Sequence, residues 1–268
     1  MTIEQSLQQP YSLSDKDAKA FRQDGFALLR NVASQTEIET FRPLIKDAVK
    51  RLNPEVRKIE DRDTYGKAFL QTMNLWEFDE QVRQFTLAEK FAGIAAGLMG
   101  VKNVRLYHDQ ALFKEAGGGF TPWHQDQYYW PLDTTNTITM WMPMMDITTE
   151  MGMLTFASGS FRDGLVKNME ISDESEQALN DYVSKKNYPV FMPDYMKAGD
   201  ATFHYGLTLH KAPANSSGHT REVMTIIYFA DGTKISPPIN EWQEKDRQRW
   251  LQSIAPGELA ASPLNPPL

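Results

Sequence analysis

The chain of 268 residues contains no cysteine, and this absence excludes several kinds of functional site at once. Disulfides, cysteine-based zinc sites, iron–sulfur clusters and thiol catalysis all require that residue. The lack of thiols fits a reducing compartment, and the first ten residues are polar and do not resemble a signal peptide. We therefore expect a cytoplasmic protein.

Long apolar runs and basic stripes are also missing. No stretch of 18 apolar residues is present, so we expect no membrane span. The net charge is −7 without a basic stripe, which argues against nucleic acid as a partner. The composition, 41% apolar and 24% charged, is typical of a globular protein, and nothing in it marks a repeat or an interdomain linker. We expect one domain over residues 1–268, and the sequence does not indicate its oligomeric state.

Hydrophobic periodicity divides the chain into a helical part and a strand-rich part. Residues 1–102 are mostly helical: a capping box at 34–37 opens a helix that Pro43 kinks or delays, and an apolar stripe over 82–98 ends at Gly100. Residues 103–232 predict short strands separated by glycine turns. The predicted strands cover 104–114, 137–144, 152–156, 201–205, 208–212 and 222–229.

Two helical segments complete this prediction. Residues 161–196 form an insertion with a polar helix over 172–186, and residues 233–268 contain a last helix, at 241–254, and a proline-rich tail. The pattern predicts a mainly β fold, a sandwich or barrel, with flanking helices.

The most informative motif is His124–Gln125–Asp126. In an extended stretch alternate side chains share a face, so His124 and Asp126 converge on one point. An imidazole and a carboxylate with one more ligand can hold a redox metal and leave coordination positions open.

A third ligand has to come from another strand. His108 is adjacent to Asp109, and two adjacent strand residues cannot chelate together; His219 lies in a polar turn. His204 and His210 remain, on either side of a turn at Gly206, and we read His204 and His108 as structural histidines near the site.

Arg221 adds a second indication, because it falls on the strand after His210 and shares a face with apolar residues. A buried arginine requires an anion, and its planar fork suits a carboxylate. A dicarboxylate cosubstrate that chelates the metal at one end and pairs with Arg221 at the other would satisfy both features.

At this point the sequence resembles a known family, the Fe(II)/2-oxoglutarate-dependent dioxygenases of the phytanoyl-CoA dioxygenase type. Ordered matches span about residues 105–230. The resemblance is carried by residues 106–114, 121–126, 152–160, 198–204 and 210–216, followed by Arg221. It implies a double-stranded β-helix (jelly-roll, cupin-like) core with a helical N-terminal region and a C-terminal helix.

The resemblance also implies residue roles. His124, Asp126 and His210 are the expected ligands of Fe(II), and Arg221 is expected to bind the distal carboxylate of 2-oxoglutarate. Some relatives have a serine two residues after the distal histidine that helps to bind 2-oxoglutarate. Ala212 stands there in this chain, so the additional cosubstrate contacts are expected from Gln110, Thr139 and Trp141; the expected substrate contacts are Phe113, Tyr128, Tyr129 and Trp130.

The implied activity is oxidation, foremost hydroxylation, of a C–H bond in a small molecule, with 2-oxoglutarate and O2 converted to succinate and CO2. Related halogenases have a small residue where Asp126 stands, so the carboxylate favours oxygen chemistry over halogenation. Two alternatives remain: a non-catalytic barrel that senses a metal or ligand, and a cupin-like hydrolase or isomerase. The substrate, and the choice between hydroxylation, desaturation, demethylation and ring formation, are not encoded in any motif.

Overall fold

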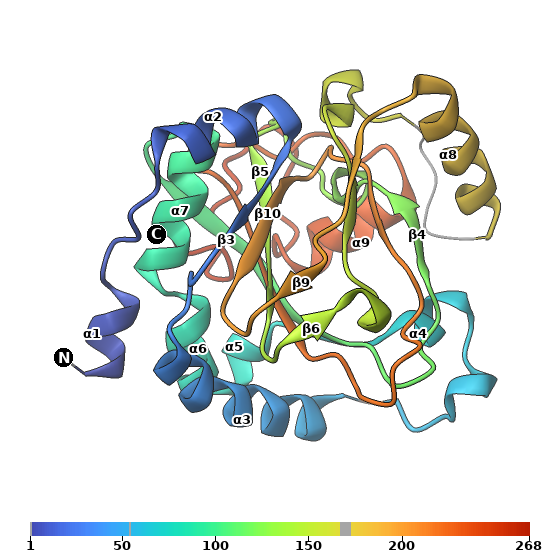
Figure 1. The fold of residues 1–268 in the computed structure, drawn as a ribbon. Helices are drawn as coiled ribbons and strands as arrows, with labels where there is room; N and C mark the ends of the chain where they lie inside the picture. The colour runs from blue at the N-terminus through green and yellow to red at the C-terminus, as the bar shows by residue number, and fades with distance from the viewer. Residues whose placement is uncertain (1, 54, 167–172) are drawn as a thin grey trace.

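The computed structural model describes residues 2–53, 55–166 and 173–268, which fold into two facing antiparallel sheets flanked by helices (Figure 1). The larger sheet has six strands, in the order β1 (Phe26–Leu29), β10 (Ala201–Tyr205), β5 (Thr137–Pro143), β12 (Val223–Ala230), β3 (Val104–Phe113) and β2 (Leu70–Met73). The smaller sheet has the order β4 (Thr121–His124), β11 (His210–Ala212), β7 (Thr155–Ala157) and β8 (Val190–Phe191). A separate pair joins β6 (Ile147–Thr148) to β9 (Tyr195–Met196). The predicted fold class is confirmed.

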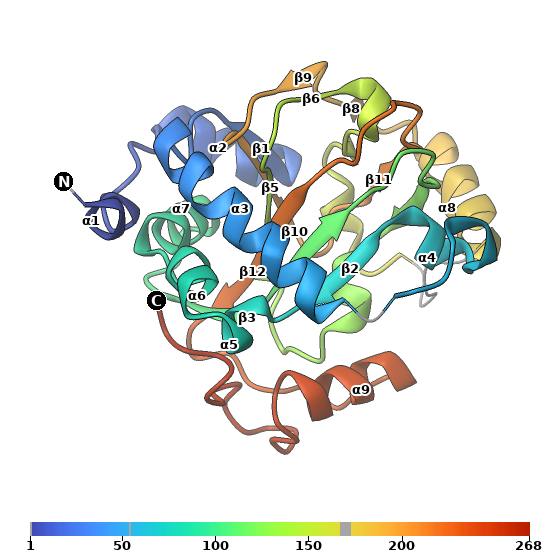
Figure 2. The ribbon, with the colours of Figure 1, turned by 90° about the horizontal axis from the view of Figure 1, so that it is seen from below.

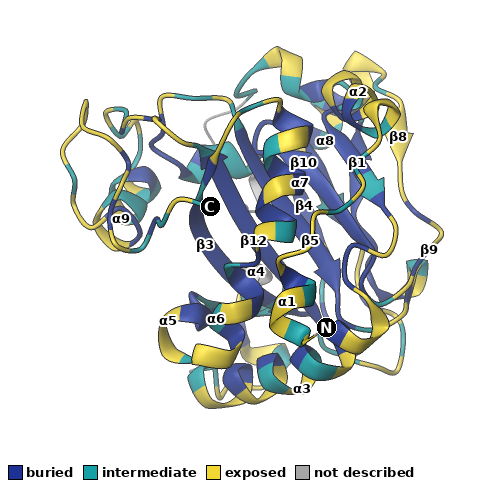
Figure 3. Cartoon of the chain, turned by 90° about the vertical axis from the view of Figure 1, so that its left-hand side faces the viewer, coloured by how far each residue is buried: buried dark blue, intermediate teal, exposed yellow. Residues whose placement is uncertain are grey.

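The N-terminal helices cover one face of the larger sheet, as Figure 3 shows. They are α1 (Ile3–Leu7), α2 (Asp15–Asp24), α3 (Gln35–Leu52), α5 (Leu75–Phe78), α6 (Glu80–Thr86) and α7 (Glu89–Met99), while α4 (Thr64–Ala68) lies by β2. The larger sheet has one face in the core and the other in the cavity, because the side chains of a strand such as β5 alternate between the two faces. Ile138, Met140 and Met142 pack in the core with the helices, whereas Thr139 and Trp141 line the cavity on the opposite side.

Two helix predictions need correction in detail. The capping box of Ser34 and Glu37 is present. Helix α3 begins at Gln35, directly after Ser34, and continues through Pro43, so its start is not delayed. The apolar stripe over 82–98 is divided between α6 and α7, because the chain bends at Leu87–Ala88, where Ala88 is extended. Gly100, with φ 72°, ends α7 as predicted.

The insertion packs outside the smaller sheet. In α8 (Asp173–Lys186), Leu179 and Val183 contact Trp123 and Leu209, and the Glu176 carboxylate accepts a hydrogen bond from the Trp123 amide at 3.2 Å. Figure 2 shows α8 and α9 (Glu241–Arg249) at different sides of the sheets. The last helix ends at Arg249, five residues before the predicted end, and the following Trp250 and Leu251 join a core cluster with Tyr107 and Trp130. Within the described ranges, no helix is both long and apolar enough to span a bilayer.

Candidate active site

A pair of antiparallel strands brings the first two candidate ligands together. His124 ends β4 and His210 begins β11, and the two residues are direct partners across the ladder, with ring centroids 4.0 Å apart. Gln125 is extended, so Asp126 faces the same side as His124, as predicted. The strand itself stops earlier than expected, because Asp126 opens a 3-10 turn, η2 (Asp126–Tyr129).

Hydrogen bonds fix how these side chains point. The Nδ1 atoms of His124 and His210 lie 2.8 and 2.9 Å from the carbonyls of Pro122 and Thr208, which leaves both Nε2 atoms turned to Asp126. Each Nε2 lies 3.6 Å from Asp126 Oδ1. One ligand atom from each of the three residues falls within 4.8 Å of the others, a spacing that suits one metal ion.

The second carboxylate oxygen of Asp126, Oδ2, is held by two neighbouring side chains. Oδ2 accepts a hydrogen bond from Thr139 Oγ1 at 2.9 Å and lies 3.3 Å from His204 Nε2. Oδ1 is thereby left facing the two histidines. His204 thus has the supporting role that the sequence suggested, while His219 is exposed in its turn. His108 lies in the wall of the cavity described below.

The protonation states suit metal binding. Burial, reinforced for His124 by His210 and for His210 by His204, lowers the pKa of both rings to about 4, so they are neutral at pH 7. Burial alone would raise the pKa of Asp126, but His210, His204 and His124 outweigh it and hold that pKa well below its ordinary value. Two neutral imidazoles and one carboxylate are therefore ready to bind a divalent cation without losing protons.

Arg221 lies deeper in the same cavity, 2% exposed. Its backbone is fixed by an isolated bridge to Lys114, with N···O distances of 2.8 and 2.9 Å. One guanidinium nitrogen donates to the carbonyl of Gly152, the ring of Trp141 lies 5.1 Å from its Cζ, and Nε has no partner. Gly152 has φ 80°, and a Cβ there would lie 2.7 Å from the Pro213 carbonyl, so glycine is needed at this contact.

Lys114 is a second buried basic residue beside Arg221, and no sequence motif singles it out. Its Nζ donates to the Gly119 carbonyl, and burial together with the Arg221 charge lowers the pKa of Lys114 to about 6. Burial lowers the pKa of Arg221 to about 9. At pH 7 Lys114 is therefore largely neutral, whereas Arg221 is charged, and Arg221 forms no ion pair with a described residue. A buried, unpaired guanidinium with an orphaned Nε makes this end of the cavity a place for an anion.

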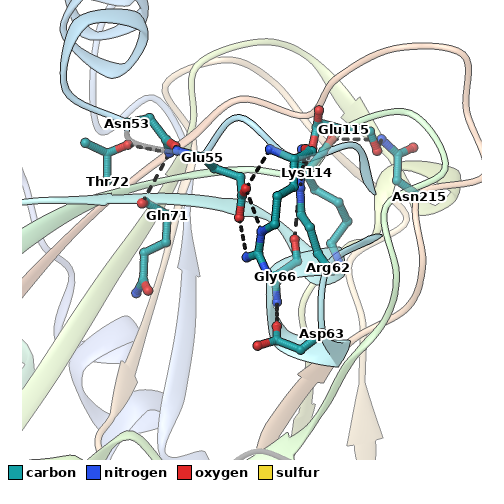
Figure 4. A network of polar contacts seen from close by, with 11 residues as sticks. Asn53, Glu55, Arg62, Asp63, Gly66, Gln71, Thr72, Lys114, Glu115 and Asn215 are labelled. Carbon is teal, nitrogen blue, oxygen red and sulfur yellow. Dashed lines mark hydrogen bonds and ion pairs between the residues drawn. The ribbon is translucent and has the colours of Figure 1, made fainter. Parts of the chain in front are cut away.

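A polar network holds the chain around Lys114 in place (Figure 4). Asn215 Nδ2 donates to the carbonyls of Lys114, Glu115 and His219, at 3.0, 3.0 and 2.8 Å. Arg62 forms a salt bridge with Glu115 and donates to the Arg57 carbonyl. These bonds tie the loop before β12, and hence Arg221, to the end of β3.

The metal cluster and Arg221 open into one cavity of about 640 Å³. Of the residues expected to contact cosubstrate or substrate, Gln110, Thr139, Trp141, Tyr129 and Trp130 line it. Phe113 and Tyr128 do not. Phe113 alternates away from Leu112 into the helix-covered core, and Tyr128 is buried against α9, its carbonyl accepting from Asn240 and Gln243.

Other lining residues escaped the sequence argument. Trp242, Asp246 and Trp250 reach the cavity from the C-terminal helix and the residue after it, more than a hundred positions from His124. The alternating pattern of β3 also places His108 and Leu112 in the wall beside Gln110. Only that alternation was available in the sequence as a signal for His108. From the insertion, none of residues 161–166 and 176–196 lines the cavity.

Two facing antiparallel sheets around a His, Asp and His cluster define the class of jelly-roll metal-dependent oxygenases. The sequence model of the family "Phytanoyl-CoA dioxygenase (PhyH)" matches residues 21–223, three quarters of the chain. The chain belongs to this phytanoyl-CoA dioxygenase family, and it is a 2-oxoglutarate-dependent dioxygenase that uses iron.

Individual relatives agree with this assignment. The chain is 25% identical to phytanoyl-CoA dioxygenase domain-containing protein 1 of Danio rerio, over 90% of this chain and 95% of the relative. Its fold matches that of the non-heme alpha ketoglutarate dependent carbocyclase SnoK from nogalamycin biosynthesis, with a TM-score of 0.80, 23% identity, and 97% and 99% of the two chains covered. It also matches EctD from S. alaskensis, a structure with 2-oxoglutarate and 5-hydroxyectoine, with a TM-score of 0.72, 17% identity, and 94% and 86% covered.

Proposed function

We propose that this dioxygenase hydroxylates a C–H bond of a small molecule, with Fe(II) held by His124, Asp126 and His210. The observation that carries this proposal is the cluster of three ligand atoms within 4.8 Å, open to a cavity of about 640 Å³. When bound, iron with 2-oxoglutarate supplies the activation of O2 and the oxidation of carbon, with succinate and CO2 as co-products.

The protein's own residues set the geometry. Thr139 and His204 hold Oδ2 of Asp126, so that Oδ1 is presented together with the two Nε2 atoms. Three ligands on one side leave the opposite side for the cosubstrate, O2 and the substrate. Asp126 fills the position that a halide would need, and this favours hydroxylation over halogenation.

The cosubstrate is assigned to the end of the cavity that contains Arg221. Arg221 is a buried cation, and its unpartnered Nε offers a distal carboxylate a hydrogen bond there. Gln110, Thr139 and Trp141 line the space between Arg221 and the ligand cluster, where a 2-oxo acid would lie. Thr225, on β12 and four residues after Arg221, lines the same cavity, and its hydroxyl donates to the Gln110 carbonyl at 3.0 Å. This hydroxyl stands in for that of the serine that some relatives have at the position of Ala212.

This arrangement favours an enzyme over the two alternatives. A sensor barrel has no use for a second anion site beside the metal cluster, and a hydrolase of the cupin type tends to recruit further histidine ligands. The proposed substrate is a small molecule. The assignment of residues 1–268 to a single oxygenase domain stays a prediction, and so does the location of the protein in the cytoplasm.

The test of the ligand set is spectroscopic. Anaerobic Fe(II) and 2-oxoglutarate should give the weak visible charge-transfer band of a 2-oxo acid chelate, and His210→Ala should abolish it. His219→Ala removes an exposed histidine and should leave the band intact. A full band together with normal succinate formation in the His210→Ala variant would show that the ligand assignment is wrong.

The test of the outcome uses labelled oxygen. A panel of small molecules is scored for succinate formed above the background without substrate. For any substrate that passes, hydroxylation requires one atom of ¹⁸O from ¹⁸O2 in the product. A product without label would favour desaturation or ring formation at the same site.

A further inference from the structure

The substrate end of the cavity contains a carboxylate that neither the metal cluster nor the cosubstrate site uses. Asp246, on α9, lines the cavity together with Trp242 from the same helix and Trp250 just after it. Helix α9 packs on η2, the turn that begins with Asp126, and this places Asp246 on the wall shared with Tyr129.

The partners of Asp246 are neutral. Its Oδ2 accepts a hydrogen bond from the Tyr107 hydroxyl at 2.8 Å, and the Trp250 side chain donates to the same carboxylate. Among the described residues, no lysine, arginine or histidine forms an ion pair with it. Burial accordingly raises the pKa of Asp246 to about 7, against the lowering effect of those two donors.

Basic side chains of the same helix do not supply a counter-charge for Asp246. Arg247 pairs with Glu244, and Arg249 lies over the Trp250 ring. Lys245 pairs with Glu241, and its Nζ lies over one face of the Trp242 ring, 4.1 Å from the centroid. In the part of the chain that the structure describes, Arg221 is the one lysine or arginine that lines the cavity, and it belongs to the cosubstrate end. At the loaded metal centre the formal charges of Fe(II), Asp126, 2-oxoglutarate and Arg221 cancel, so that centre does not neutralise Asp246.

Aromatic rings line the cavity together with this carboxylate. Trp242 lies edge-on to Tyr129, with ring centroids 6.2 Å apart, and Trp250 lies 5.4 Å from the ring of His108. His108 is 4% exposed and its Nδ1 has no partner. Aromatic faces attract cations, and a buried carboxylate without a counter-charge is stabilised by one.

We propose that Asp246 and the rings of Trp242, Trp250 and Tyr129 form a recognition site for the protonated amine of the substrate. The substrate class is therefore a small molecule with a basic nitrogen next to an apolar or aromatic body, and its nitrogen is anchored on α9 while its carbon skeleton faces Asp126. This inference rests on the proposed function for the identity of the reacting centre, but the amine site itself needs no metal to exist.

The test is a pair of matched probes in isothermal titration calorimetry on the full chain. 2-(2-Naphthyl)ethylamine is cationic at pH 7.5, and 2-(2-naphthyl)ethanol is its neutral counterpart. The wild-type protein should bind the amine at least tenfold more tightly than the alcohol, both with and without Fe(II) and 2-oxoglutarate. Equal affinities, tighter binding of the alcohol, or no binding of the amine at millimolar concentration would each overturn the proposal.

Variants locate the effect. Asp246→Asn keeps an acceptor for Tyr107 but removes the charge, and should weaken amine binding by about 10- to 100-fold while leaving the alcohol unchanged. Glu80→Gln removes an exposed carboxylate of α6 and should change neither affinity. Tyr107→Phe frees one oxygen of Asp246 and should retain the preference for the amine. If Asp246→Asn keeps the wild-type preference, the carboxylate does not recognise the amine.

The two proposals fail separately. The charge-transfer band of Fe(II) and 2-oxoglutarate should persist in Asp246→Asn, since Asp246 forms no hydrogen bond or ion pair with His124, Asp126 or His210. A lost amine preference with an intact band refutes only the amine site. A missing band in the wild type, with the preference retained, refutes only the assignment of the metal centre.

Discussion

Replacing Arg221 with methionine should remove the affinity of the site for the distal carboxylate of 2-oxoglutarate. The substitution keeps the length and most of the apolar volume of the side chain but removes the cation. Because Arg221 is 2% exposed and its Nε has no partner in the protein, a bound carboxylate would gain hydrogen bonds shielded from water. Methionine cannot replace these bonds.

The size of the loss follows from burial. Truncating one partner of a buried, hydrogen-bonded charge pair costs about 2–5 kcal/mol. At about 1.4 kcal/mol for each factor of ten, the dissociation constant of 2-oxoglutarate should rise roughly 30-fold to several thousand-fold. Lys114, with a pKa of about 6, is largely neutral at pH 7 and does not replace the lost cation, so the full range applies.

The assay compares two cosubstrates. 2-Oxobutyrate has the chelating end of 2-oxoglutarate but lacks the distal carboxylate, and both are titrated anaerobically with Fe(II) by their charge-transfer bands. Arg221→Met should weaken 2-oxoglutarate alone, so that the two affinities converge. Arg51→Met, which removes a half-exposed cation of α3, serves as the control. If the variant weakens both ligands equally, Arg221 does not bind the distal carboxylate.

Three further predictions concern neighbouring residues. Thr139→Val removes the hydrogen bond to Oδ2 of Asp126 and should weaken Fe(II) binding about 10- to 100-fold in a metal titration, whereas unchanged affinity would remove Thr139 from the site. Asp109→Ala deprives the Leu75 and Trp76 amides and the Thr86 hydroxyl of their buried acceptor, and should lower the free energy of unfolding in urea by about 1–3 kcal/mol or more. Lys114 has a pKa of about 6 in the folded protein against about 10.5 when unfolded, so the unfolded chain binds more protons between these values and stability rises with pH there. Lys114→Met should reduce the slope of unfolding free energy between pH 7 and 9 by up to about 1.4 kcal/mol per pH unit, and an unaltered slope would show that Lys114 is charged in the folded state.

Local patterns in the sequence were sufficient for most of the elements. The alternation in β5 and the capping box before α3 were both predicted correctly, because each depends on residues only a few positions apart. The break between α6 and α7 was missed, since the apolar stripe continues across Ala88 although the backbone bends there. Pro43 does not delay the start of α3, which begins at Gln35 and includes Pro43, because tertiary packing outweighs the local preference.

The residues of the site divide in the same way. Spacing pointed to His124, Asp126 and Arg221 and left His204 and His210 as alternatives, and the family resemblance favoured His210. The chain folds so that all five residues line one cavity. Phe113 and Tyr128 were placed wrongly, although both are adjacent to residues that do line it. One step along a strand turns the side chain to the opposite face, and one step along a 3-10 turn rotates it by about a third of a turn. A motif therefore predicts the direction only of the residues that it contains.

By itself, then, the sequence was sufficient for the family and the class of chemistry, because a His-x-Asp pair and an arginine on an apolar strand face are visible in residue type and strand period. Only the tertiary structure decided what surrounds that centre. Lys114 meets Arg221 through an isolated bridge between residues 107 positions apart, and Asp246 reaches the cavity because α9 packs on the turn that holds Asp126. Contacts over such distances along the chain depend on the packing of whole elements, and no local pattern encodes them.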